Sequence, residues 1–219
     1  MSGTCVRLAK LGYFVTAPEL FAREVDVNTM TDLQTILDTV TAKILGSQVA
    51  TDIDSAIARA GATKKGRCRA AGDHRFSAGA AVKWLYAAGN PAVKAGVAWY
   101  RGPLLVGWTP ADAGNSAIRQ WDREYHPKDP IDLVADLRAP VLGFYGGADP
   151  GIPVASVERM REALKAAGKT AEIIVYPETP HAFHSDYRPS YREGRRRMAG
   201  SACSSGSSAT ASPEPGHLS

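Results

Sequence analysis

Two kinds of segment alternate along this chain, and this alternation constrains its fold more than any other feature. Continuous apolar runs, typical of strands covered on both faces, occur at residues 13–20, 92–100, 139–147 and 171–177. Segments with apolar residues three or four positions apart, typical of helices, occur at residues 47–61, 80–89 and 154–168. The pattern predicts an α/β fold in which helices cover both faces of a mostly parallel sheet.

Length and composition predict a single domain. The chain has 219 residues, of which 44% are hydrophobic and 22% are charged, and this is enough to bury a sizeable core. Residues 101–130 contain prolines and glycines without a sustained period, so we expect a long loop or lid there. Residues 198–219 are rich in Ser, Gly, Ala and Pro, and we predict a disordered tail after a domain of residues 1–197.

The net charge of +4 is unevenly distributed along the chain. Residues 64–75 and 188–197 each carry five Lys or Arg against one acid, so together they contribute +8 and the remaining residues −4. Neither cluster comes with aromatic or groove-reading elements, and we expect no nucleic-acid partner. Three widely separated cysteines favour a reducing compartment and no metal site. Without a signal-peptide core or an apolar run of about 20 residues, we expect a cytoplasmic protein with no membrane span.

An acid and a histidine come after two of the predicted strands. Asp149 lies in "YGGADPGIP", and His181 lies in "YPETPHAFHSDY" after the next strand. Since the ligand crevice of a parallel sheet lies beyond the carboxyl ends of its strands, both side chains should face one crevice. Their order is that of the α/β-hydrolase triad, in which the acid accepts the Nδ1 proton of the histidine. The alternatives are an Asp149 that bonds only its own backbone and a His181 that only packs.

The nucleophile of such a triad should precede the acid, on a tight turn that opens the helix of residues 80–89. Ser77, in "HRFSAGAA", occupies the nucleophile position of a GxSxG turn, with Gly79 after it but Arg75 in place of the first glycine. The turn also requires a strand before it, and residues 66–75 lack the apolar run of a buried strand. Ser77 is therefore the candidate nucleophile, in an unusual local sequence.

Four segments carry more specific motifs: "RLAKLGYFVTAPELFAR", "WLYAAGNPAVKAGVAWY", "HPKDPIDLVADLRAPVLGFYGGADPGIP" and "AEIIVYPETPHAFHSDYRPSYR". Together they resemble the dienelactone hydrolase (carboxymethylenebutenolidase) family of α/β hydrolases. The resemblance implies hydrolysis of a small ester or lactone through an acyl-enzyme, without a metal or organic cofactor. It places the nucleophile at Ser77, where family members have cysteine, the acid at Asp149 and the base at His181. It also implies that Arg23 holds a substrate carboxylate; the alternative is a solvated surface arginine.

The carboxyl end departs from the family pattern. Members have an amphipathic closing helix similar to "DGWQRMLEWFKRHGVA", whereas this chain has "RMAGSACSSGSSATASP". One choice of codons for "RMAGSACSSGSSATASP" encodes "DGWQRMLEWFKRHGVA" when the reading frame moves by two bases. We therefore hypothesise a frameshift near residue 194, and a weaker case of the same kind at "GDHRFSAGAA".

The amino end departs as well. In the family, strands before the helix "RLAKLGY" supply an oxyanion-hole N–H and a glutamate that poises the cysteine, and this chain begins almost inside that helix. An oxyanion hole with the Ala78 N–H alone would lack a donor, which costs on the order of a hundredfold in rate. Serine is also a weaker nucleophile than a thiolate. We expect low activity, and the alternative is a catalytically inactive remnant of such a hydrolase.

Resequencing the gene tests the frameshift hypothesis directly. We expect an inserted or deleted base near codon 194, whose correction makes the downstream frame encode the amphipathic helix. A confirmed, uninterrupted frame through residues 194–219 would contradict the hypothesis.

Overall fold

The computed structural model describes residues 2–18, 20–21, 25–26, 29–32, 35–36, 39–40, 46–63, 71–76, 86, 90–100, 128, 130–186 and 188–204. Its elements in chain order are α1 (Ser2–Lys10), α3 (Gly46–Ala62), β1 (Ala71–Phe76), β2 (Val93–Trp99), η3 (Pro130–Asp136), β3 (Val141–Gly146), α6 (Val154–Ala166), β4 (Ala171–Tyr176) and α7 (Glu193–Ser204). From β2 to α7, strands and helices alternate, as the sequence pattern predicts.

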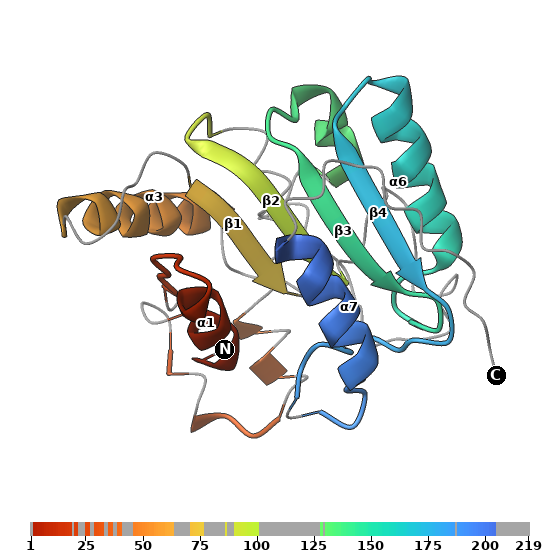
Figure 1. Cartoon of the computed structure of the whole chain (residues 1–219), viewed down its shortest axis with the longest axis horizontal. Coiled ribbons are helices and arrows are strands. Elements are labelled where there is room, and N and C mark those ends of the chain that lie inside the picture. Colours follow the sequence, from red (N-terminus) through yellow and green to blue (C-terminus); the bar gives the residue numbers. More distant parts are fainter. Residues whose placement is uncertain are drawn as a thin grey trace.

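The four strands of the described part form one parallel sheet in the order β1-β2-β3-β4, and their arrowheads point in the same direction (Figure 1). Because the strands are parallel and in sequence order, all four carboxyl ends meet at the same edge of the sheet. This edge lies just beyond Trp99, Gly146 and Tyr176, and it is where the predicted acid and histidine should lie.

Helix α6 shows why the sequence pattern predicts its element well. Val157, Met160 and Leu164 lie on one side of the helix and are buried, whereas Val154 is exposed. This stripe packs against β4 and η3, and Figure 1 shows α6 running beside β4. The helix ends just before Gly168, whose φ of +63° favours glycine.

An aromatic cluster fills the core beside the carboxyl ends of the strands. The rings of Trp99 and Phe144 have centroids 4.6 Å apart, and Phe144 stacks on Tyr176 at 6.2 Å. Phe183, several residues after β4, contacts Trp99 and Tyr176. Phe144, Trp99 and Phe183 have no exposed surface. Fully buried aromatic rings therefore lie directly beneath the edge at which the strands end.

Most predicted elements are confirmed: α3, β2, β3, α6 and β4 lie within two residues of the predicted segments. The strand predicted at residues 13–20 is wrong for residues 13–18, which have no regular structure. Tyr13 and Phe14 are exposed, and no strand in the described part of the chain pairs with them. An apolar run alone does not make a strand when no neighbour accepts its backbone hydrogen bonds.

The sequence pattern gives no indication of a buried strand before Ser77, but the structure has a strand there. Residues 71–76 form β1, which pairs with β2 in parallel from Gly72 opposite Ala95 to Phe76 opposite Trp99. The run is polar, but pairing with β2 satisfies its backbone groups, and such tertiary context overrides strand propensity. The helix predicted at 80–89 lies outside the described residues except for Tyr86, which is helical and buried.

The predicted start of a disordered tail at residue 198 is wrong. Helix α7 continues to Ser204, and Ala199 is fully buried against the core. Arg195 lies over the Tyr176 ring, with its guanidinium carbon 5.5 Å from the ring centroid, so α7 packs on β4. Residues 205–219 lie outside the described residues. The loop or lid predicted at residues 101–130 does so too, except for Lys128 and for Pro130, at which η3 begins.

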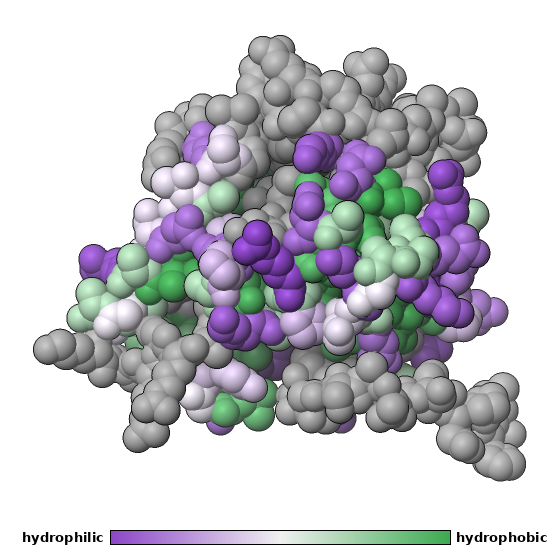
Figure 2. Space-filling view, turned by 90° about the horizontal axis from the view of Figure 1, so that it is seen from above, coloured by the Kyte–Doolittle hydropathy of each residue, from purple (hydrophilic) through white to green (hydrophobic). Residues whose placement is uncertain are grey.

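The described side chains on the face seen in Figure 2 are of mixed hydropathy. Figure 2 shows hydrophilic side chains over much of the face seen from above, with hydrophobic ones visible between them. None of the helices in the described ranges combines the length and apolar character needed to cross a bilayer.

Candidate functional site

Asp149 is held in a turn just after β3. Its backbone N–H donates to the Gly146 carbonyl at 3.4 Å, and its Oδ1 accepts from the Gly151 N–H at 2.9 Å. The carboxylate is buried, with 1% of the side chain exposed. The acid therefore does bond its own turn, which is one of the two interpretations of the sequence, but this leaves Oδ2 for another donor.

His181 supplies the partner for that second oxygen. Its Nδ1 lies 2.6 Å from Asp149 Oδ2, although the two residues are 32 positions apart in the chain. One third of the imidazole side chain is exposed, against 1% of the carboxylate. The structure thus brings together the two residues that the sequence predicts for one crevice, with the carboxylate inside and the imidazole at the surface.

A close backbone approach at Gly146 sets this distance. A Cβ placed on Gly146 would lie 2.1 Å from the Thr179 carbonyl oxygen, closer than any side chain tolerates. Next to it, the Gly147 N–H donates to the Tyr176 carbonyl at 2.8 Å and the Ala148 N–H to the Thr179 carbonyl at 3.1 Å. The glycines of "YGGADP" therefore let the turn that carries Asp149 lie directly on the segment that leads to His181.

Phe183 anchors the segment that follows His181. Its ring is fully buried among Trp99, Tyr100 and Tyr176, at centroid distances of 5.9, 5.4 and 5.6 Å. Its carbonyl accepts from the Arg192 N–H at 2.9 Å. Because the ring is locked two residues after His181, the imidazole has little freedom to swing away from Asp149.

Tyr100 is a residue of the site that the sequence analysis missed. It lies directly after β2, is 1% exposed, and its ring makes an edge-to-face contact with the His181 imidazole at a centroid distance of 5.1 Å. Its hydroxyl lies 3.3 Å from the Ser185 Oγ. The only sequence signal was its position at the end of a predicted strand.

Comparison with known proteins adds the family. The model of the dienelactone hydrolase family matches residues 1–204, a range that includes every described residue. The chain belongs to the dienelactone hydrolase family. The resemblance stated from the four sequence segments is thereby confirmed.

Similar proteins include members of this family from several bacteria. A "Putative carboxymethylenebutenolidase" of Methylorubrum extorquens is 54% identical over 188 residues, which cover 86% of this chain and 60% of that protein. One from Escherichia coli with the same description is 46% identical, covering 89% of this chain and 68% of that protein. The chain therefore spans about two thirds of the length of these two relatives.

A solved structure supports the fold. The crystal structure of a "Putative Dienelactone Hydrolase" from Klebsiella pneumoniae superposes with a TM-score of 0.80 at 41% identity. The superposition covers 92% of this chain and 77% of that one. The fold is the α/β-hydrolase fold, in agreement with the predicted fold class.

Two further site residues were predicted from the sequence, Ser77 and Arg23. Both lie outside the described residues. For Ser77 the structure gives its sequence neighbour, since Phe76 is the last residue of β1. The predicted nucleophile therefore comes directly after a strand whose carboxyl end points to the same edge as those of β3 and β4.

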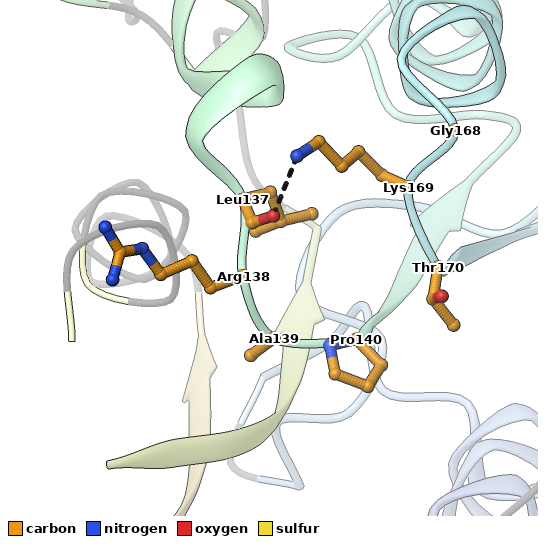
Figure 3. A pocket seen from close by; sticks show the side chains of 7 residues that line it. All are labelled: Leu137, Arg138, Ala139, Pro140, Gly168, Lys169 and Thr170. Carbon is orange, nitrogen blue, oxygen red and sulfur yellow. Dashed lines mark hydrogen bonds between the residues drawn. The ribbon is translucent and has the colours of Figure 1, made fainter. Parts of the chain in front are cut away.

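A pocket of about 200 Å³ lies at the opposite end of the sheet, between residues 137–140 and 168–170 (Figure 3). These residues precede β3 and β4, whereas Asp149 and His181 come after them. Lys169 Nζ donates to the Leu137 carbonyl at 3.1 Å, and Arg138 extends away from Lys169. Ligands of parallel sheets bind at the carboxyl ends, so this pocket is not the candidate active site.

His184, three residues after His181, is a second histidine with a different environment. It is 8% exposed, and its ring centroid lies 4.3 Å from that of Trp99. Burial, reinforced by the Arg7 and Arg196 charges and opposed by Asp186, lowers the pKa of His184 from 6.5 to about 4. This histidine is therefore a neutral core residue at neutral pH.

Replacing Gly146 with Ala should destabilise the fold by about 1–3 kcal/mol, because the new methyl group overlaps the Thr179 carbonyl and the backbone must move. The free energy of unfolding, measured by urea denaturation, checks this. Gly61→Ala is the matched control, since a Cβ there meets nothing within 4 Å, and it should stabilise α3 by about 0.5–1 kcal/mol. Equal or greater stability of the Gly146 variant would contradict the close approach.

The lowered pKa of His184 predicts a pH dependence of stability. Between pH 6.5 and about 4 the unfolded chain binds a proton at this residue that the folded chain does not, so stability falls as the pH falls through this window. The full effect on the free energy of unfolding is about 3 kcal/mol. In urea denaturation, His184→Gln should lose less stability than the parent chain between pH 7 and pH 4.5. Parallel losses in the two proteins would refute the assignment.

Proposed function

We propose that this protein is an ester or lactone hydrolase that acts through a nucleophile, Asp149 and His181. The observation that carries the proposal is the 2.6 Å contact between His181 Nδ1 and Asp149 Oδ2 at the carboxyl edge of a parallel sheet. Membership of the dienelactone hydrolase family supports the same reaction class. The substrate would be a small-molecule ester or lactone.

In the proposed mechanism each atom of the pair has a task. Asp149 Oδ2 accepts the Nδ1 proton, so the neutral imidazole presents Nε2 as the proton acceptor. When the nucleophile attacks the ester carbonyl, Nε2 takes its proton, and the buried carboxylate stabilises the imidazolium that forms. Nε2 then returns the proton to the leaving alcohol as the ester C–O bond breaks, which leaves an acyl-enzyme.

Water completes the cycle in the same way. His181 Nε2 removes a proton from water as the water oxygen attacks the acyl carbon, and then protonates the departing nucleophile. The imidazole side chain is one third exposed, so water can reach it. Each of these steps uses only side chains of this chain and water.

Ser77 is the nucleophile in this proposal. Its support is that β1 exists and ends at Phe76, which gives the strand-then-nucleophile order that an α/β-hydrolase turn requires. Because serine replaces the cysteine of the family pattern and is a weaker nucleophile than a thiolate, turnover should be slow. Arg23 is proposed to bind the carboxylate of substrates that carry one.

Hydrolysis of p-nitrophenyl acetate and of a dienelactone tests this function. The parent chain should release product, His181→Ala and Ser77→Ala should fall to the uncatalysed rate, and Asp149→Asn should lose at least about 100-fold, the usual contribution of positioned proton transfer. Asp136→Asn, an exposed acid in η3, is the matched control and should retain the parent rate.

A negative result is equally clear. If the parent chain and His181→Ala release product at the same rate, the hydrolase proposal fails for this chain. The alternative, a folded member of the family without turnover, would then hold.

A further inference from the structure

We propose that Tyr100 is a positioning residue that holds the His181 imidazole in its productive orientation, acting jointly with Ser185. The catalytic importance of this role rests on the proposed function, whereas the positioning itself is a property of the fold. Three independent features of Tyr100 lead to this inference: its backbone conformation, its ring contact and its hydroxyl contact.

The backbone of Tyr100 is held in a conformation that non-glycine residues rarely adopt. Its φ is +36°, directly after the last residue of β2. Its N–H donates to the Phe144 carbonyl at 2.6 Å, which ties the end of β2 to β3, the strand that leads to Asp149. Strained residues of this kind persist when surrounding contacts over-determine them, and they concentrate at functional sites. An ordinary core tyrosine could continue the strand without this strain.

The strained backbone places the Tyr100 ring against the imidazole. The two ring planes meet at 63° with centroids 5.1 Å apart, an edge-to-face contact. The Tyr100 ring also contacts that of Phe183, at 5.4 Å and 68°. The phenol ring therefore touches both His181 and the buried anchor two residues later. Asp149 fixes the Nδ1 edge of the imidazole, and the Tyr100 ring limits rotation of the ring about that hydrogen bond.

The Tyr100 hydroxyl reaches the far end of the same turn. It lies 3.3 Å from Ser185 Oγ, and the Ser185 N–H donates to the Ala182 carbonyl at 2.9 Å. Ala182, directly after His181, has a φ of +59° and is therefore strained as well. The Tyr100 side chain thus spans the turn from His181 to Ser185. Its ring contact with His181 and its hydroxyl contact with Ser185 should act as one unit.

The direct readout is the Nδ1 proton of His181, observed by NMR in chain labelled with ¹⁵N-histidine and assigned by its loss in His181→Ala. In the parent chain we expect a low-field signal protected by the bond to Asp149. Tyr100→Leu removes the ring edge and the hydroxyl, so exchange of this proton with water should accelerate at least about tenfold or the signal should vanish.

Two milder variants separate the hydroxyl from the ring. Tyr100→Phe and Ser185→Ala should each accelerate exchange about two- to fivefold, and the double variant should match either single one because both remove the same contact. In the ester assay the same variants should lower kcat in the same order and leave KM within about twofold. Conservative replacement by Phe should therefore rescue most of the rate that Leu loses.

Tyr86→Phe is the matched control. The Tyr86 hydroxyl donates to Asp54, so the variant loses a hydroxyl contact of a buried tyrosine elsewhere in the fold. It should lower stability without changing the His181 proton or kcat. Circular dichroism shows whether Tyr100→Leu folds. If this variant folds and the exchange rate of the His181 proton is unchanged, the inference is overturned. If this variant does not fold, an unchanged exchange rate in both Tyr100→Phe and Ser185→Ala overturns the inference.

The two proposals fail in different ways. If the parent chain has no His181-dependent turnover, the proposed function fails, while the NMR series still decides whether Tyr100 positions the imidazole. If turnover depends on His181 but the proton is indifferent to Tyr100 and Ser185, only the positioning role fails.

Discussion

The contact of the Gly146 backbone with the Thr179 carbonyl determines the geometry of the candidate site. Because no Cβ fits between them, the turn after β3 and the segment after β4 lie closer than side chains would allow. The parallel sheet fixes the two strand ends, and this contact fixes the two loops that leave them. The 2.6 Å distance between the Asp149 and His181 side chains is the consequence, although the residues are far apart in sequence.

Conformational strain is concentrated around this pair. Tyr100, Glu178 and Ala182 are the non-glycine residues with positive φ in the described part of the chain, and all three lie in the segments that follow β2 or β4. Each such residue costs about 1–3 kcal/mol, which the aromatic core beneath them must offset. The fully buried rings of Trp99, Phe144 and Phe183 supply that burial, so the rigid site depends on the apolar cluster directly below it.

The sequence predicts the parts of this arrangement that arise from local pattern. The stripe of α6 and the apolar runs of β3 and β4 predict their elements, and the positions of Asp149 and His181 after strands predict a shared edge. The sequence pattern could not predict β1, whose polar residues are held by pairing with β2. It also could not predict that Tyr13 and Phe14 are exposed, with no described strand beside them. Tyr100 was missed for the same reason, since its role comes from contacts with residues that are distant in the sequence.

A proton shared between the Asp149 carboxylate and the His181 imidazole at the carboxyl edge of the sheet is the basis of the proposed chemistry. A crystal structure of this chain, at a resolution that defines both side chains, is the decisive test. We predict His181 Nδ1 within hydrogen-bond reach of Asp149 Oδ2, near 2.6 Å. Side chains separated by more than about 4 Å, or directed into different regions of the molecule, would refute the pairing.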